Sequence, residues 1–214
     1  MGREIVAAIV LWMLAGACAT AATVDVAVVD KNAMSAPDSV ITLEPDGSQA
    51  LATHLPEKAV IDQRDETFLP LVVIVRKGGR VVFTNNDETM HQVYSFSAIK
   101  QFQFVIKQGE VSAPVEFDQP GIAAVGCNIH DQMITYVFVA DAPFAAVSDG
   151  QGHAEIRDVP PGRYRISLWH PQMLVGEAPL SQSVTVDEHG ASLSPALPIA
   201  VTAMHGMKHM HMGY

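Results

Sequence analysis

The sequence predicts an all-β protein. Short runs rich in β-branched and aromatic residues recur along most of the chain, and Gly, Pro, Asn and Asp divide them, as is typical of strands joined by turns. Apolar and polar residues alternate within the runs, and no amphipathic helix of about ten or more residues stands out. Many short strands at such spacing favour a β-sandwich or barrel.

Each predicted strand is a run of this kind that ends at turn-forming residues. In chain order the runs lie within 24–30, 39–45, 71–85, 101–109, 113–121, 121–127, 134–141, 162–171 and 181–190. The stretch Ser95–Lys100 is expected to form one helical turn or a loop. Val159–Gly162, which contains two prolines, predicts a turn before the strand that follows it. Aromatic residues within strands are expected in the core: Phe83, Tyr94, Phe96, Phe104 and Phe138.

The first residues resemble a secretory signal peptide, assigned to 1–22. Arg3 precedes an apolar run from Ile5 to Ala17, and small residues follow up to Ala22. The apolar run is too short to suggest a spanning helix, so we expect no integral membrane span after the signal is removed. A lipid-modified Cys18 is the alternative, although Ala15–Ala17 lacks the large aliphatic residue that such a site carries.

The rest of the chain is long enough for one large β-domain or two small ones. Its net charge is −10, because Arg3 and Glu4 cancel within the signal. An acidic surface argues against nucleic acid or an anionic membrane as a partner and favours a basic protein surface.

Cys127 would then be the only cysteine of the exported protein, because Cys18 leaves with the signal. Oxidising compartments normally use cysteines in pairs, so an unpaired one suggests an intermolecular disulfide, a reactive thiol or a metal ligand. Cys127 lies in GCNIHDQM, where His130 and Met133 follow at three-residue steps. Upstream, His91 begins a strand directly after a polar loop, and a sandwich could place it opposite this segment.

Two imidazoles and a thiolate in a near-trigonal plane, with a weak axial thioether, form the ligand set of blue copper electron-transfer sites. We therefore predict a copper site of His91, Cys127, His130 and Met133. C-x2-H-x2-M lacks the cysteine pairs of a structural zinc site. A Cys–His nucleophile pair is possible in principle, but three residues apart on one tight loop the two side chains would more readily face a shared metal. The alternatives are a buried or disulfide-forming Cys127 and a core Met133.

At these residues the chain resembles the cupredoxins, and its short loop matches that of amicyanin-type proteins. Residues 59–144 more closely resemble the periplasmic cupredoxin-like proteins often labelled methylamine utilisation protein. The resemblance implies a Greek-key β-sandwich with one type 1 copper at its end, His91 buried, and His130 near the surface as the electron's exit. Gln92 departs from the Asn that many cupredoxins carry after the first histidine.

The flanking segments resemble the two halves of a carboxypeptidase-regulatory-like β-sandwich. They contain VDVAVVDKNAMSAPDSVITLEP near the start and SDGQGHAEIRDVPPGRYRI later in the chain. Our hypothesis is that 23–58 and 143–203 form one accessory domain around a cupredoxin domain at 59–142.

A Met/His-rich tail occupies 204–214, where the strand pattern is lost. Thioethers bind Cu(I) and imidazoles bind Cu(II), so the tail either captures copper or is idle. Its candidate ligands are Met204, His205, Met207, His209, Met210, His211 and Met212.

The remaining histidines are expected to be structural or solvated. His54, His153 and His189 lie in predicted turns, and His170 ends a strand beside Trp169, where packing is favoured over a second soft site with Met173. The apolar side chains before the two ligand histidines, Met90 and Ile129, are expected to form a docking patch, since transient redox interfaces are small.

The leading interpretation is a periplasmic one-electron carrier and not an enzyme, because nothing resembles an acid–base pair or an oxyanion cradle. Its redox partner would be a basic protein, for example a c-type cytochrome or a periplasmic dehydrogenase. The alternatives are a copper-delivery protein whose metal is cargo and a binding module that uses copper only for stability.

Overall fold

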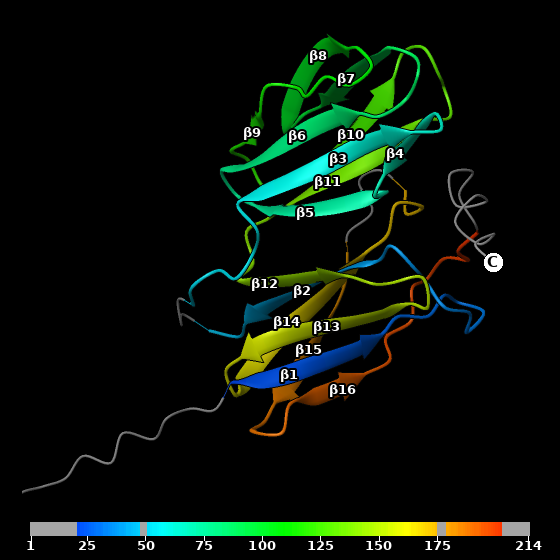
Figure 1. Cartoon of the computed structure of the whole chain (residues 1–214). Helices are drawn as coiled ribbons and strands as arrows, with labels where there is room; N and C mark the ends of the chain where they lie inside the picture. The colour runs from blue at the N-terminus through cyan, green and yellow to red at the C-terminus, as the bar shows by residue number, and fades with distance from the viewer. Residues whose placement is uncertain (1–20, 48–50, 175–178, 203–214) are drawn as a thin grey trace, which may run out of the picture.

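The computed structural model describes residues 21–47, 51–174 and 179–202. Within these ranges the regular elements are all β-strands and no helix occurs, so the all-β prediction is confirmed. The strands form four sheets, two in each of two bodies that lie one above the other in Figure 1. No helix in the described ranges has the length and apolar character needed to cross a membrane.

The first body contains a five-stranded and a four-stranded sheet, in the orders β5-β11-β10-β7-β8 and β4-β3-β6-β9. Its side chains alternate between the space between the sheets and the outside, and those that point inward form one apolar core. The bounds of its strands are β3 (Lys58–Arg64), β4 (Thr67–Leu69), β5 (Val72–Arg76), β6 (Gly79–Asn85), β7 (His91–Ser97), β8 (Lys100–Ile106), β9 (Val115–Phe117), β10 (Gly121–Cys127) and β11 (Ile134–Ala140).

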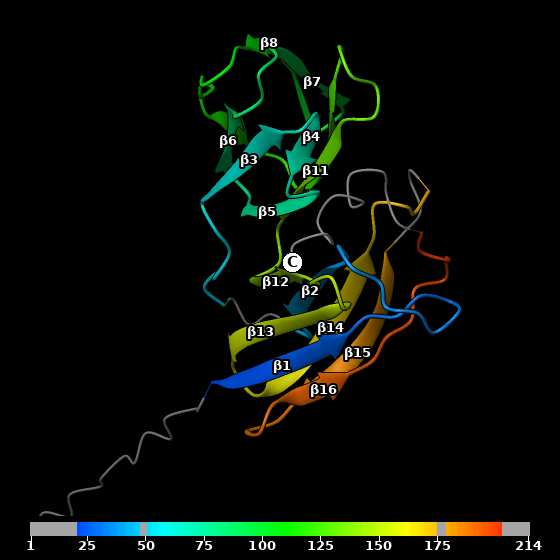
Figure 2. The same cartoon turned by 45° about the vertical axis from the view of Figure 1, so that its right-hand side comes forward.

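The second body combines strands from both ends of the chain, as Figure 2 shows by their colours. Here β1 lies between β13 and β16, and β2 lies between β12 and β14. N-terminal strands thus pair with C-terminal strands, β1 with β13 and β2 with β14. The division of the chain into a cupredoxin domain and an accessory domain stays a prediction. The bounds are β1 (Ala22–Ala27), β2 (Val40–Pro45), β12 (Phe144–Val147), β13 (His153–Val159), β14 (Gly162–Trp169), β15 (Leu180–Val186) and β16 (Ala191–Leu193).

The two bodies meet along β5 and β11. Val73 and Val75 belong to the core of the first body, whereas Val72 and Ile74, on the other face of the same strand, belong to the core of the second. The Trp169 ring, at the end of β14, lies 5.5 Å from the Tyr136 ring and 5.8 Å from the Phe138 ring of β11. At β5 and β11 this sheet is therefore covered on both faces, which explains the continuous apolar run in β5.

Two expectations about the first body are wrong. The stretch Ser95–Lys100 forms neither a helical turn nor a loop alone, because β7 continues to Ser97 and β8 begins at Lys100. Phe96 is 72% exposed, whereas Phe83 is fully buried. Phe96 lies on the outer face of β7, where it contacts the Tyr94 ring at 5.0 Å. Strand membership predicts alternation between two faces, but it does not say which face is covered.

Candidate metal centre

Strand pairing brings His91 and Cys127 together at one end of the first body. His91 is the first residue of β7 and Cys127 is the last residue of β10. These strands are antiparallel neighbours, with Cys127 opposite Val93. The start of one strand therefore lies beside the end of the other, and the loop after Cys127 carries His130 over the same edge.

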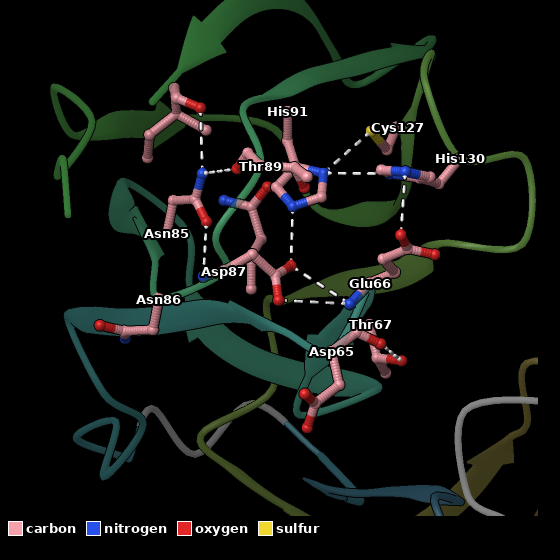
Figure 3. A network of polar contacts seen from close by, with 12 residues as sticks. Asp65, Glu66, Thr67, Asn85, Asn86, Asp87, Thr89, His91, Cys127 and His130 are labelled. Carbon is pink, nitrogen blue, oxygen red and sulfur yellow. Dashed lines mark hydrogen bonds and ion pairs between the residues drawn. The ribbon is translucent and has the colours of Figure 1, made fainter. Parts of the chain in front are cut away.

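Three potential ligand atoms converge there, as Figure 3 shows. The Sγ of Cys127 lies 3.5 Å from His91 Nδ1, and His130 Nδ1 lies 3.4 Å from the same nitrogen. All three atoms lie within 4.8 Å of one another. His91 is fully buried, Cys127 is 2% exposed, and the His130 side chain is 18% exposed. The structure thus brings together three of the four predicted ligands, one of them near the surface.

A carboxylate occupies the opposite nitrogen of each imidazole. Asp87 Oδ2 lies 2.7 Å from His91 Nε2, and Glu66 Oε1 lies 3.3 Å from His130 Nε2. The Asp87 carboxylate accepts a hydrogen bond from His91, which holds the ring proton on Nε2 and leaves Nδ1 with a free lone pair. At His130 the contact is an ion pair, and the negative charge of Glu66 favours the ring proton on the adjacent Nε2. Metal-binding histidines commonly have such a partner, which orients the ring and raises its basicity.

This arrangement fits a soft metal cation. Two Nδ1 lone pairs and one sulfur face a common space, and only the thiol can donate a hydrogen bond there. A cation would satisfy all three atoms together, whereas without one the two ring nitrogens repel each other. The donor set of two imidazoles and a thiolate suits copper, which accepts both ligand types.

Met133 is placed beside the cluster by the backbone of the loop. Its N–H donates to the carbonyl of His130 at 3.0 Å, closing a tight turn. Its side chain is 2% exposed and belongs to the apolar core of the first body. An axial ligand and a core residue would both be buried in this way, so the role of Met133 as a ligand stays a prediction.

The loop before His91 is held by Asn85, the last residue of β6. Its side-chain oxygen accepts from the N–H of Asp87 at 2.9 Å, and its amide nitrogen donates to the carbonyls of Thr89 and Ile106. These bonds fix the loop so that the Asp87 carboxylate points at His91 (Figure 3).

Gln92 connects the two ligand-bearing segments. Its side-chain oxygen accepts from the Asn128 amide at 2.9 Å, and its carbonyl accepts from the Asn128 N–H at 3.0 Å. Gln92 therefore forms a side-chain link between the strand of His91 and the loop after Cys127.

Sequence reasoning missed the two carboxylates. A signal existed for Asp87, which stands four residues before His91 in a polar loop. None existed for Glu66, because it approaches His130 only through the packing of the β3–β4 turn against the loop after β10.

Within the described ranges, the other histidines lie apart from the cluster. His54, His153 and His189 are exposed. His170 is 2% exposed; its Nε2 donates to the carbonyl of Pro37 and its Nδ1 accepts from the N–H of Gln172. Both ring nitrogens of His170 are thus used by the protein. Residues 1–20 of the predicted signal segment and the tail ligands at 204–212 lie outside the described residues. Ala22, the last residue of the predicted signal, is instead the first residue of β1, where it is buried opposite Val159.

Comparison with known proteins gave partial likenesses only. No family model and no curated protein matches the chain. Among solved structures, it is similar to a purple cupredoxin from Nitrosopumilus maritimus, with 21% identity over 38% of this chain and 99% of that one and a TM-score of 0.34. The chain is also similar to amicyanin from Paracoccus versutus, with 19% identity over 46% of this chain and 98% of amicyanin and a TM-score of 0.36.

A third similar structure is the copper-containing nitrite reductase of Thermus scotoductus, at 22% identity and a TM-score of 0.37; the match spans 46% of this chain and 25% of that one. These likenesses cover less than half of the chain at low identity. The functional inferences below therefore depend on the geometry of the site.

Proposed function

We propose that the protein is a one-electron carrier with a mononuclear copper site formed by His91, Cys127, His130 and Met133. The observation that supports it most is the cluster itself, in which two imidazoles present Nδ1 to one thiol while carboxylates hold both Nε2 atoms. Copper would supply the Cu(I)/Cu(II) couple there.

The residues of the site suit both oxidation states. The Cys127 thiolate is a soft ligand, the imidazoles of His91 and His130 are intermediate in softness, and a distant Met133 thioether would tune the reduction potential. His91 and Cys127 are buried at strand ends, and hydrogen bonds hold both segments. A site held this firmly has little to rearrange when the electron moves, which favours fast transfer.

The exit for the electron in this proposal is the His130 edge. His130 is the most exposed of the three converging residues, and the apolar side chains of Met90 and Ile129 are exposed, at 54% and 44%. An apolar patch beside a partly exposed ligand suits brief docking. The acidic balance of the chain favours a basic redox partner, such as a c-type cytochrome or a periplasmic dehydrogenase.

The proposal includes export to the periplasm through the signal-like segment 1–22. It also includes the division of the chain into an inserted cupredoxin domain (59–142) and an accessory β-domain (23–58 and 143–203). The pairing of β1 with β13 and of β2 with β14 supports this division.

Copper delivery is the second candidate, favoured by the Met/His-rich sequence at 204–214. A carrier of electrons keeps its metal through a redox cycle, whereas a delivery protein releases it to an acceptor. Retention of copper through repeated reduction and oxidation in the presence of a Cu(I) chelator favours the carrier, and loss in the first cycle favours delivery.

Reconstitution with Cu(II) tests the site. We expect an intense visible thiolate-to-copper band and reversible reduction. Cys127→Ser should abolish the band because it removes the thiolate, and the control His153→Gln, at an exposed histidine, should keep it. A colourless or redox-silent copper complex of the unaltered chain would reject the electron-carrier proposal.

A further inference from the structure

The turn between β3 and β4 contacts His130 directly and is linked to His91 through Asp87. Arg64 pairs with Thr67 across a two-residue turn whose central residues, Asp65 and Glu66, have φ angles of 50° and 53°. Positive φ at both central positions matches the hairpin turn type in which Asn or Asp followed by Gly is preferred. Asp65 fits this preference, but Glu66 stands where Gly is preferred, although the left-handed conformation disfavours side chains such as that of Glu.

Glu66 reaches the two imidazoles through different groups. Its backbone N–H donates to both carboxylate oxygens of Asp87, at 3.3 and 3.2 Å, and Asp87 in turn holds His91 Nε2. Its side-chain carboxylate lies 3.3 Å from His130 Nε2. One turn residue thus connects to His91 through its backbone and to His130 through its side chain (Figure 3).

We propose that Glu66 is a positioning residue that orients both imidazoles toward a shared metal and strengthens the binding of Cu(II). The part that concerns copper rests on the proposed function, whereas the part that concerns the ring proton of His130 does not. The negative charge of the Glu66 carboxylate, 3.3 Å from Nε2, favours the ring proton on that nitrogen and so keeps the His130 lone pair on Nδ1, facing Cys127 and His91.

The charge of Glu66 has a second effect. A carboxylate one imidazole away from the metal stabilises the doubly charged Cu(II) more than the singly charged Cu(I). The reduction potential of the site should therefore be lower with Glu66 than without its charge. The Glu66 side chain is 50% exposed, so salt should screen part of this effect.

Asp65 offers a matched control within the same turn. It is also acidic, exposed and at positive φ, so its substitution makes the same change in net charge and a similar change in backbone preference. In Figure 3 its carboxylate points away from the histidines. Effects that appear on changing Glu66 but not Asp65 therefore depend on the contacts of the Glu66 carboxylate, which lies beside His130 Nε2 and accepts from the Gln132 side chain at 3.5 Å.

The first experiment uses the metal-free full chain. NMR of the imidazole nitrogens should show His130 with its proton on Nε2 in the unaltered protein and in Asp65→Ala. Glu66→Ala should give a mixture of the two neutral forms, because the negative charge beside Nε2 is lost. An unchanged ring proton in Glu66→Ala would overturn the orienting role, whether or not copper binds.

The second experiment adds copper. Glu66→Ala should weaken Cu(II) binding about tenfold, at the low end of what the loss of an outer partner of a metal ligand costs, and Asp65→Ala should stay within about twofold. Glu66→Gln keeps an oxygen at the same place but removes the negative charge. It should therefore raise the reduction potential of the site more than Asp65→Asn does, and the difference between the two variants should be smaller at high salt.

The two proposals fail in different ways. Equal Cu(II) affinities and potentials for the Glu66 and Asp65 variants would overturn the effect of Glu66 on the metal, although the carrier proposal would survive. Failure of the unaltered chain to form the thiolate-to-copper band would overturn the carrier proposal, and the NMR result would still decide the orienting role.

Discussion

At the scale of single residues, the candidate metal centre depends on two imidazoles, each of which has a carboxylate beside its Nε2. His91 and His130 use Nε2 for carboxylates and face Cys127 with Nδ1. The two rings differ in exposure, because His91 begins a buried strand and His130 lies in a loop. In the proposed copper site, Cys127 would supply the preference for a soft metal. Asp87 and Glu66, which the ligand motif does not include, lie against the two imidazoles and would orient them.

Met133→Leu is the residue-scale prediction for the axial position. Leu is close to Met in volume, so the free energy of unfolding should fall by less than about 1.5 kcal/mol. The visible copper band should remain, because the thiolate is retained, and the reduction potential should rise, because a weak donor to Cu(II) is lost.

Spectroscopy, a redox titration and urea unfolding check this prediction. An unchanged potential together with an unchanged band would show that Met133 is a core residue and not a ligand. Loss of the band would show instead that the thioether holds the copper geometry.

At the scale of elements, the end of β14 is fastened to the segment before β2 by a buried imidazole. His170 Nε2 donates to the carbonyl of Pro37 at 3.0 Å. Burial lowers the pKa of His170 below its ordinary value of 6.5, and the bond to Pro37 offsets only part of this shift. Neutral His170 is therefore the form that the folded protein prefers.

The sign of the pH effect follows from this lowered pKa. In the unfolded chain His170 takes up a proton near pH 6.5, whereas in the folded protein it does so only at lower pH. His170 thus contributes stability that is complete above about pH 6.5 and is lost as the pH falls toward its folded pKa. Urea unfolding should show that, as the pH falls below about 6.5, the free energy of unfolding decreases more steeply for the unaltered chain than for His170→Gln.

His189→Gln is the control for this element, because His189 is exposed and lies at the turn after β15. It should keep the pH profile of the unaltered chain. Identical profiles for His170→Gln and the unaltered chain would contradict the prediction.

At the scale of the whole molecule, the two bodies share the sheet that contains β5 and β11. The Trp169 side chain of the second body covers the outer face of this sheet at Tyr136 and Phe138. Trp169 is 7% exposed, and burial at this contact raises the pKa of Tyr136 above its ordinary value of 10.0. The contact therefore excludes water from the junction between the bodies.

Trp169→Ala should lower the free energy of unfolding by about 3–5 kcal/mol, because it opens a cavity between the bodies. Phe96→Ala is the matched control, since Phe96 is an exposed aromatic residue of the same sheet, and it should change stability by only about 0.5 kcal/mol. Denaturant unfolding measures both. Equal losses for the two variants would show that the junction contributes little to stability.

Much of the fold and of the candidate site could be predicted from the sequence where the deciding pattern lies among neighbouring residues. Alternation and turn residues predict many strands of both bodies, although β3, β12 and β16 lie outside the predicted runs. The spacing of Cys127, His130 and Met133 predicts one side of the candidate metal centre. Local patterns failed where a contact between distant segments decides the outcome. Phe96 was expected in the core because it lies in a strand, but no layer covers that face of β7 in the part of the chain that the structure describes.

By itself, the sequence determined the all-β class and the candidate ligand types, because strand alternation and side-chain chemistry are properties of neighbouring residues. Only the tertiary structure decided which nitrogen of each imidazole faces Cys127 and which carboxylates hold the other nitrogen. Glu66 lies 64 residues before His130, and only the packing of the β3–β4 turn against the loop after β10 brings the two side chains together. Such a contact is a property of the whole fold, so no spacing within a motif can predict it.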